Sequence, residues 1–281
     1  AMNDSTTMPR PIVSADWLLA HLGDPGIRII DIRWQLGGPP GFEAYVAGHI
    51  PGAVFVDLPQ DLAAPTGPGR HPLPSAEQLT EVMRRVGVGN ETDVIVYDDA
   101  GGSNAARLWW LLRWLGHERV AVLDGGVSSW GGPLEHGPPP PPPQGDFSPR
   151  DPETAWVVEL DEVAARQPNI VLLDARHPAR YAGISEPVDP RAGHIPGARS
   201  AFWEENLDAS GRFLSPAKLR ARFRFLGLET GSDAIVYCGS GVTSCHLLLA
   251  LEHAGMPGAR LYAGSWSDWC SRPDSPVATD A

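Results

Sequence analysis

The chain has 281 residues, more than one average domain contains, and 42% of them are hydrophobic, which is enough for two separate cores. Its formal net charge of -12 disfavours nucleic acid as a partner, and it means that a local positive field must attract any anionic substrate. The odd number of cysteines, three, argues against a disulfide framework. The sequence has no apolar run of membrane length and no apolar signal core near its start, which argues against a membrane partner. Together these features predict a cytoplasmic protein.

Four blocks of sequence occur twice, in the same order and about 140 residues apart, which indicates a duplicated domain. In the first half they are Ile29-Ile-Asp31-Ile-Arg33, Gly48-His-Ile-Pro-Gly-Ala53, Val94-Ile-Val-Tyr-Asp98 and Asp124-Gly-Gly-Val-Ser-Ser-Trp130. In the second half they are Leu172-Leu-Asp174-Ala-Arg176, Gly193-His-Ile-Pro-Gly-Ala198, Ala234-Ile-Val-Tyr-Cys238 and Ala263-Gly-Ser-Trp-Ser-Asp-Trp269. We therefore expect domains over residues 10–136 and 151–281, joined by an extended proline-rich linker over residues 137–150.

Each half alternates short apolar strands with longer helical patterns. The strands are runs such as 94–97 and 234–237, whose length and β-branched content fit a buried strand. The helical patterns cover residues 75–86, 102–115, 216–226 and 241–254. This alternation predicts an α/β fold in which each domain holds a mostly parallel sheet flanked by helices.

The two repeats differ at the tip of one strand, where the first half has Asp98 and the second has Cys238. After the cysteine, Gly239 and Gly241 let consecutive backbone N–H groups turn inward at the start of a helix. Such a loop favours a thiolate and can hold an anionic leaving group beside the sulfur, although a buried and unreactive cysteine is the alternative. Because Asp98 is no sulfur nucleophile, we expect one active site, in the second half.

Four features of the sequence resemble the rhodanese superfamily, specifically its tandem-domain thiosulfate and 3-mercaptopyruvate sulfurtransferases. They are the paired Gly-His-Ile-Pro-Gly-Ala blocks, the loop Cys238-Gly-Ser-Gly-Val-Thr243, the closing Gly264-Ser-Trp266 and the cysteine-free first repeat. The resemblance covers essentially the whole chain and implies two tandem rhodanese-like domains. It implies that Cys238 takes sulfur from a small donor as a persulfide and passes it to cyanide or a thiol, with thioredoxin as a candidate acceptor. It implies no metal and no other cofactor.

The same resemblance assigns roles around the cysteine. The terminal sulfur of the persulfide needs hydrogen-bond donors, which we expect from the Ser240 hydroxyl and from the loop residues Gly239, Gly241, Val242 and Thr243. Thiosulfate-preferring vertebrate rhodaneses carry Arg and Lys where this chain has Gly239 and Ser240. This difference favours 3-mercaptopyruvate as the donor.

Two arginines and a proton-transfer set complete what the resemblance implies. Arg180 and Arg191 are the candidates for holding the donor carboxylate, with a solvated surface arginine as the alternative for each. Ser240, His71 and Asp61 match a Ser, His and Asp set that moves protons of the donor's carbonyl, with a structural role in a proline-rich surface loop as the alternative for His71.

Two other classes of function share part of this pattern. Cysteine phosphatases and arsenate reductases also place a thiolate in a loop of N–H groups, but they have an arginine where this chain has Ser244. A persulfide carrier or redox-sensing scaffold that delivers sulfur to a protein partner would use the same chemistry, and steady turnover with a small donor would distinguish an enzyme from it. Cys245, His246 and His253 lack a second cluster with metal-ligand spacing, so we expect no metal.

Overall fold

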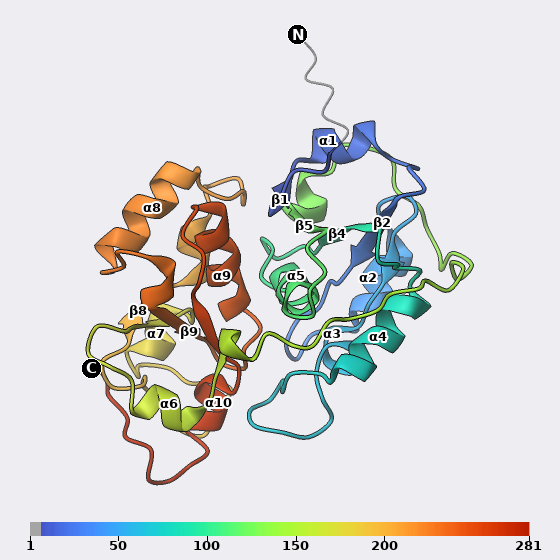
Figure 1. The fold of residues 1–281 in the computed structure, drawn as a ribbon. Coiled ribbons are helices and arrows are strands. Elements are labelled where there is room, and N and C mark those ends of the chain that lie inside the picture. Colours follow the sequence, from blue (N-terminus) through green and yellow to red (C-terminus); the bar gives the residue numbers. More distant parts are fainter. Residues whose placement is uncertain (1–6, 281) are drawn as a thin grey trace. The chain divides into compact units, whose positions relative to one another are not determined.

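Each repeat folds around a five-stranded sheet in which all neighbouring strands are parallel (Figure 1). The computed structural model describes residues 7–280. The first sheet has the strand order β1-β5-β4-β2-β3, and the second has β6-β10-β9-β7-β8. The two orders are the same when the strands are counted within each repeat, so the structure confirms the predicted α/β fold and the duplication.

The elements of the first repeat follow one another as strands and covering helices. They are β1 (Ile12–Val13), α1 (Ala15–Ala20), β2 (Ile27–Asp31), α2 (Gly41–Ala47), β3 (Val54–Phe55), α3 (Leu58–Asp61), α4 (Ala76–Arg85), β4 (Asp93–Tyr97), α5 (Ala105–Trp114), β5 (Val120–Leu123) and the 3₁₀ turn η1 (Gly126–Ser129). Strand β4 lies inside the sheet, and its last four residues are buried. A strand covered on both faces reads as a continuous apolar run, as Val94-Ile-Val-Tyr97 does.

The second repeat gives the same sequence of elements with small differences. They are η2 (Thr154–Trp156), β6 (Val157–Val158), α6 (Leu160–Ala164), β7 (Val171–Asp174), α7 (Pro178–Tyr181), β8 (Arg199–Ser200), η3 (Trp203–Asn206), α8 (Pro216–Phe225), η4 (Gly231–Asp233), β9 (Ala234–Tyr237), α9 (Ser244–His253), β10 (Arg260–Tyr262) and α10 (Ser265–Trp269). Helix α8 begins where the sequence signals it, because Pro216 follows Ser215, whose hydroxyl accepts from the N–H of Lys218.

The helices after β4 and β9 start three residues later than the sequence pattern predicts. Gly102 and Gly241 stand at the predicted starts, and their φ angles are +88° and +80°. These left-handed conformations are incompatible with a helix but suit a chain that curls around a central group. The glycines therefore belong to the loops at the strand tips, and α5 and α9 begin at Ala105 and Ser244.

The chain divides into two compact units whose boundaries do not follow the sequence repeat throughout. The first unit ends its opening stretch at Asp61 and resumes over Ala76–Pro152, while the segment Leu62–Ser75 belongs to the second unit together with the chain from Glu153 onward. A loop of the first repeat is thus part of the unit that holds Cys238. None of the helices described for residues 7–280 has the length and apolar character that a membrane crossing requires.

The proline-rich stretch has no regular secondary structure and is fastened to the first unit. The backbone N–H groups of Gly145, Phe147 and Arg150 donate to carbonyl oxygens of Arg84, Val88 and Leu115. The Phe147 side chain is buried. This part of the chain is therefore held in place by hydrogen bonds and by one apolar anchor.

Candidate active site

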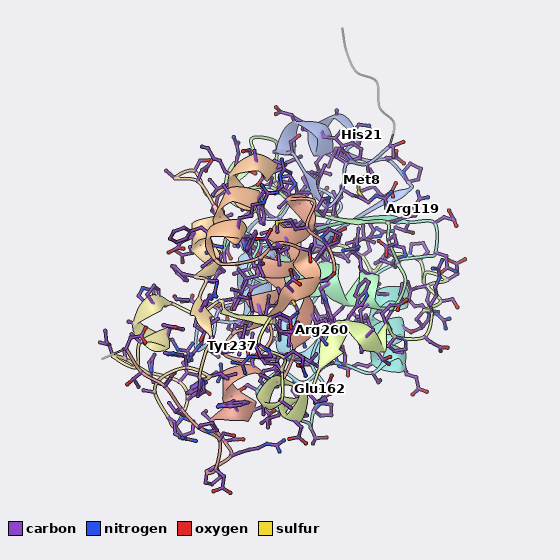
Figure 2. All side chains as sticks on the ribbon, turned by 60° about the vertical axis from the view of Figure 1, so that its left-hand side comes forward. Met8, His21, Arg119, Glu162, Tyr237 and Arg260 are labelled. Atoms are coloured by element: carbon purple, nitrogen blue, oxygen red, sulfur yellow. The ribbon has the colours of Figure 1, made fainter. Side chains whose placement is uncertain are left out.

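Cys238 lies directly after β9, at the carboxyl end of the second sheet. Its strand is fully buried, and Tyr237, the last residue of β9 (labelled in Figure 2), accepts a hydrogen bond on its hydroxyl from the N–H of Ile195 at 3.2 Å. The Cys238 N–H donates to Ser265 Oγ at 3.1 Å, and its carbonyl accepts from the N–H of Trp266 at 2.9 Å. The first turn of α10 therefore fixes the backbone of Cys238.

The loop after Cys238 closes over the sulfur. The N–H of Gly241 donates to Cys238 Sγ at 3.1 Å. A side chain at Gly241 would place its Cβ 2.5 Å from the carbonyl oxygen of Ala263, and the positive φ would strain it further, so only glycine fits. The sequence thus places glycine where the backbone must approach both the sulfur and the neighbouring strand.

The surroundings of Cys238 stabilise its thiolate. Burial on its own raises the pKa of the thiol, but the hydroxyls of Ser244 and Thr243 and the N–H groups of Ser240 and Ser244 outweigh this effect, so the pKa of Cys238 lies below its ordinary value. The Ser244 hydroxyl is buried and makes no hydrogen bond of good geometry with the residues described. It therefore acts on the sulfur as a nearby dipole.

The lowered pKa predicts how the reactivity of Cys238 varies with pH. Iodoacetamide reacts with the thiolate, whose fraction rises as pH passes the pKa, so alkylation should be half-maximal below the value of about 8.5 found for a free thiol. Thr243→Val removes one stabilising hydroxyl and should move this midpoint to higher pH, which peptide mass spectrometry after timed alkylation would measure. Cys270, whose pKa burial raises, serves as the internal control and should react more slowly. A midpoint at or above that of the free thiol would contradict this account.

His71 lies beside the loop, next to the Ser240 hydroxyl. Its Nδ1 is 2.8 Å from Ser240 Oγ, and both side chains are buried, so one proton is shared between them. The segment that carries His71 is fastened to α10: the N–H of Arg70 donates to Ser267 Oγ at 3.1 Å. The structure therefore brings together two of the three predicted members of the proton-transfer set.

Asp61, the third member, is the last residue of the first unit before Leu62–Ser75. Its Oδ2 accepts from the N–H of Asp57 at 2.9 Å and from Arg85 Nη2 at 2.8 Å. These bonds close α3 and tie it to α4. The carboxylate oxygen is thus engaged within its own unit, and its role toward His71 stays a prediction.

Arg180 lies near the cysteine loop, as the sequence indicates. If Gly239 carried a side chain, its Cβ would lie 3.5 Å from both Nη1 and Nη2 of Arg180. The guanidinium donates from Nε and Nη2 to Glu186 at 2.8 to 3.2 Å, and from Nη2 to Asp189 at 3.0 Å. Burial alone would raise the pKa of Glu186, but Arg180 and the N–H groups of Asp189 and Val188 hold it below its ordinary value, so Glu186 is ionised. Two carboxylates therefore orient this arginine.

Arg191 is held by backbone carbonyls of the same unit. Its Nη1 donates to the carbonyl of Arg272 at 3.1 Å, and its Nη2 donates to the carbonyl of Ser275 at 3.0 Å. Its own carbonyl accepts from Trp266 Nε1 at 2.9 Å. These contacts fasten the chain after α10.

Sequence reasoning missed Arg70. A Cβ at Gly239 would be 2.8 Å from Arg70 Nη2, closer than either nitrogen of Arg180, and Arg70 is paired with Asp189, which also binds Arg180. Its position directly before His71 was the signal available. That signal becomes informative only once the fold of residues 62–75 places the pair over the loop.

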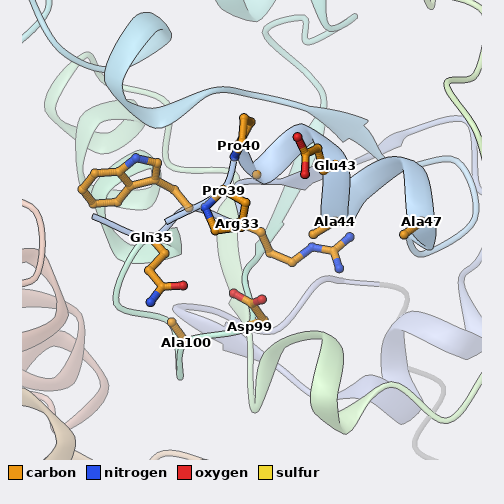
Figure 3. Close-up of a pocket in the computed structure, with 11 residues that line it drawn as sticks. Arg33, Gln35, Pro39, Pro40, Glu43, Ala44, Ala47, Asp99 and Ala100 are labelled. Carbon is orange, nitrogen blue, oxygen red and sulfur yellow. The ribbon is translucent and has the colours of Figure 1, made fainter. Parts of the chain in front are cut away.

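The equivalent loop in the first unit holds a carboxylate in place of the sulfur. Asp98 is fully buried and accepts, each at 2.9 Å, from the N–H groups of Ala100, Gly102, Asn104 and Ala105. A pocket with a volume of about 620 Å³ lies beside it, lined by Arg33, Asp99 and one face of α2 (Figure 3). None of the predicted site residues lines this pocket. The N–H groups of the loop already donate to the Asp98 side chain, so the first unit offers no sulfur nucleophile there.

All three cysteines are free and buried. Within the described part of the chain, no group of three or more His, Cys, Asp or Glu side chains is placed so that it could hold a metal ion.

Comparison with known proteins places this geometry in a family. The model of the rhodanese-like domain matches the chain twice, over residues 14–132 and 159–272. A protein of Pseudomonas aeruginosa named "Probable 3-mercaptopyruvate sulfurtransferase" is 44% identical over 279 residues, which cover 95% of this chain and 98% of the relative. "Thiosulfate/3-mercaptopyruvate sulfurtransferase 2" of Arabidopsis thaliana is 33% identical over 295 residues, which cover 95% and 86%.

The fold agrees with that of a solved relative. The crystal structure of SseA from Escherichia coli, described with the catalytic mechanism of 3-mercaptopyruvate sulfotransferases, matches with a TM-score of 0.80 and 37% identity, over 92% of this chain and 99% of that one. Because the family model matches both repeats, and these make up most of the chain, the protein belongs to the rhodanese-like family and carries two such domains in tandem.

Proposed function

We propose that the protein is a sulfurtransferase that moves a sulfane sulfur from 3-mercaptopyruvate, or from thiosulfate, through a persulfide on Cys238 to a thiophilic acceptor. The observation that carries this proposal is the Cys238 sulfur itself, which accepts the Gly241 N–H at 3.1 Å and has a lowered pKa. A thiolate held in this way is a nucleophile with donors ready for the charge on its product. The names of the relatives that match the full chain support the same reaction.

The first half-reaction differs between the two donors in its protons. The Cys238 thiolate attacks the outer sulfur of thiosulfate, the S–S bond breaks, and sulfite leaves with the electron pair. With 3-mercaptopyruvate the C–S bond breaks, its electrons form the enolate of pyruvate, and the proton of the donor's thiol must finally reach carbon. Only the second donor therefore needs a group that moves a proton.

The site residues take the following roles in this proposal. Ser240 and His71 share a proton and pass it between the donor's sulfur and its carbonyl, and Asp61 supports His71. Arg180 holds the donor's anionic end. The persulfide is held by Gly239, Gly241, Val242 and Thr243. In the second half-reaction the acceptor attacks the outer sulfur and restores the thiolate of Cys238.

The proposal extends to the roles of the two domains, the acceptor and the cellular compartment. Residues 151–281 form the catalytic domain, residues 10–136 the non-catalytic one, and residues 137–150 the connection. The acceptor is cyanide or a thiol, and thioredoxin is the protein thiol to test first. The three free cysteines support a reducing compartment such as the cytoplasm, and the net charge of -12 speaks against nucleic acid as a partner.

A kinetic comparison of the two donors tests this function. With cyanide as the acceptor, the purified protein should form thiocyanate steadily from both donors, and kcat/KM should be higher for 3-mercaptopyruvate because Gly239 and Ser240 add no positive charge for a dianion. A protein that takes up one sulfur per chain and then stops until a partner protein is added would instead be a carrier. Absence of any sulfur on Cys238 with either donor would refute the proposal.

A further inference from the structure

We propose that Arg70 is a second donor-binding arginine, which holds the anionic end of the sulfur donor over Gly239 together with Arg180. This inference rests on the proposed sulfurtransferase function and names the group that recognises the donor. The ligand chemistry is an oxyanion, either the carboxylate of 3-mercaptopyruvate or the sulfonate end of thiosulfate. Arg70 reaches this place because the segment Leu62–Ser75 folds with the catalytic unit.

The guanidinium groups of Arg70 and Arg180 both lie close to Gly239. A Cβ built on Gly239 would lie 2.8 Å from Arg70 Nη2 and 3.5 Å from both Nη1 and Nη2 of Arg180. The space directly over Gly239, one residue from the nucleophile, is thus bordered by two arginines from different segments of the catalytic unit. A side chain larger than that of glycine would compete with them for this space.

Carboxylates bind only some of the N–H donors of each guanidinium. Arg70 pairs with Asp189 through Nη1, while Arg180 uses Nε and Nη2 for Glu186 and Asp189. Among the described residues, no hydrogen bond is formed by Arg70 Nη2 or by Arg180 Nη1. A guanidinium carries five N–H donors in a planar fork, so the carboxylates orient the two groups and leave donors facing the space over Gly239.

One donor of Arg70 is unpaired among the described residues. Arg70 Nε is buried and has no hydrogen-bond partner among residues 7–280. A buried N–H without a partner is unfavourable, and such atoms in native structures point to a missing ligand or water. An oxyanion that bridges Nε and Nη2 of Arg70 would satisfy this donor in the bidentate geometry that guanidinium groups favour.

Arg191, the other candidate for a second arginine, differs from Arg70 and Arg180 in that backbone carbonyls hold both of its terminal nitrogens. Each of its two terminal nitrogens already donates to a backbone carbonyl, one of Arg272 and one of Ser275. We therefore assign Arg191 to fastening the chain after α10, and Arg70 to the donor. If Arg70 holds the donor, Arg70→Ala should weaken donor binding and Arg191→Ala should not. The reverse is expected if Arg191 holds the donor.

Steady-state kinetics on full-length variants gives the first readout. Arg70→Ala should lower kcat/KM about tenfold to hundredfold with each donor, the range for losing a hydrogen bond to a charged group, mainly through KM. Arg70→Lys keeps a cation beside Asp189 but loses the fork, so it should show an intermediate loss and provides a folded variant if the alanine protein is unstable. The matched control is Arg224→Ala, which removes an exposed charge from the same unit and should leave both donors unaffected.

The second readout does not depend on sulfur transfer. Pyruvate has the donor's carboxylate but no sulfur, and when bound it should protect Cys238 from iodoacetamide. The pyruvate concentration that halves the alkylation rate should rise about tenfold or more in Arg70→Ala and stay unchanged in Arg224→Ala. If wild-type protein loads no sulfur from either donor, the proposed function fails, and pyruvate protection still tests Arg70. Protection and KM that stay at wild-type values in Arg70→Ala, while Arg191→Ala shifts both, would overturn this inference.

Discussion

Replacing Cys238 by serine is expected to abolish sulfur transfer, with a loss of more than about 10³-fold for both donors. A serine hydroxyl is not ionised near neutrality and cannot carry a sulfane sulfur, whereas the thiol of Cys238 has a lowered pKa and sits against the Gly241 N–H. Thiocyanate formation would measure the loss. Mass spectrometry of wild-type protein treated with donor should show an added mass of roughly 32 Da, that of one sulfur atom, on the peptide that contains Cys238.

The other two cysteines provide the controls. Cys245 donates to the carbonyl of Gly241 at 3.4 Å, a bond that a serine hydroxyl can replace, and Cys270 lies at the end of α10. Cys245→Ser and Cys270→Ser should both keep most of the activity. Sulfur found on Cys245, with full activity in Cys238→Ser, would show that the nucleophile has been assigned to the wrong residue.

The strand tips of the two repeats show what the sequence could predict and where it stopped. The apolar runs before Asp98 and Cys238 identified two buried strands, and the glycines after Cys238 identified a loop of N–H groups, because both features are local. The structure confirms the strands and shows Gly241 donating to the sulfur. The helix starts were predicted too early because helical periodicity continues through Gly102 and Gly241, and only their positive φ angles end it.

The contacts of His71 and Arg70, to which we assign roles toward the donor, were beyond the reach of the sequence. His71 and Arg70 are more than a hundred residues from Ser240 and Asp189, and no local pattern says that residues 62–75 fold with the second repeat. A family resemblance indicated His71 but was silent on Arg70. For Arg191 the resemblance indicated a contact with the donor, which stays a prediction, and nothing in the sequence indicated that the carbonyls of Arg272 and Ser275 hold its guanidinium.

Replacing His71 by alanine should lower kcat for 3-mercaptopyruvate by roughly 10² to 10⁴, the usual contribution of a positioned acid or base. Cleavage of the C–S bond leaves an enolate and requires the thiol proton to reach carbon, and the pair of His71 Nδ1 and Ser240 Oγ, 2.8 Å apart, is placed to move it. Persulfide formation from thiosulfate moves no proton and should change little. Single-turnover loading of Cys238 with each donor, followed by rapid quench and mass spectrometry, would measure the two rates separately.

Ser240→Ala should reproduce the effect of His71→Ala, and the double variant should lose no more than either single one, because the two side chains act on the same proton as a unit. His136→Ala, which alters an exposed histidine of the first unit whose Nδ1 lies 2.7 Å from the carbonyl oxygen of Ala47, is the matched control and should be neutral. Asp61→Asn should weaken 3-mercaptopyruvate turnover if Asp61 supports His71, whereas equal effects of Asp61→Asn and Arg85→Ala would trace the change to their ion pair. A loss in His71→Ala that is the same for both donors would mean that the histidine only holds the segment Leu62–Ser75 against the catalytic loop, since thiosulfate has no proton for it to move.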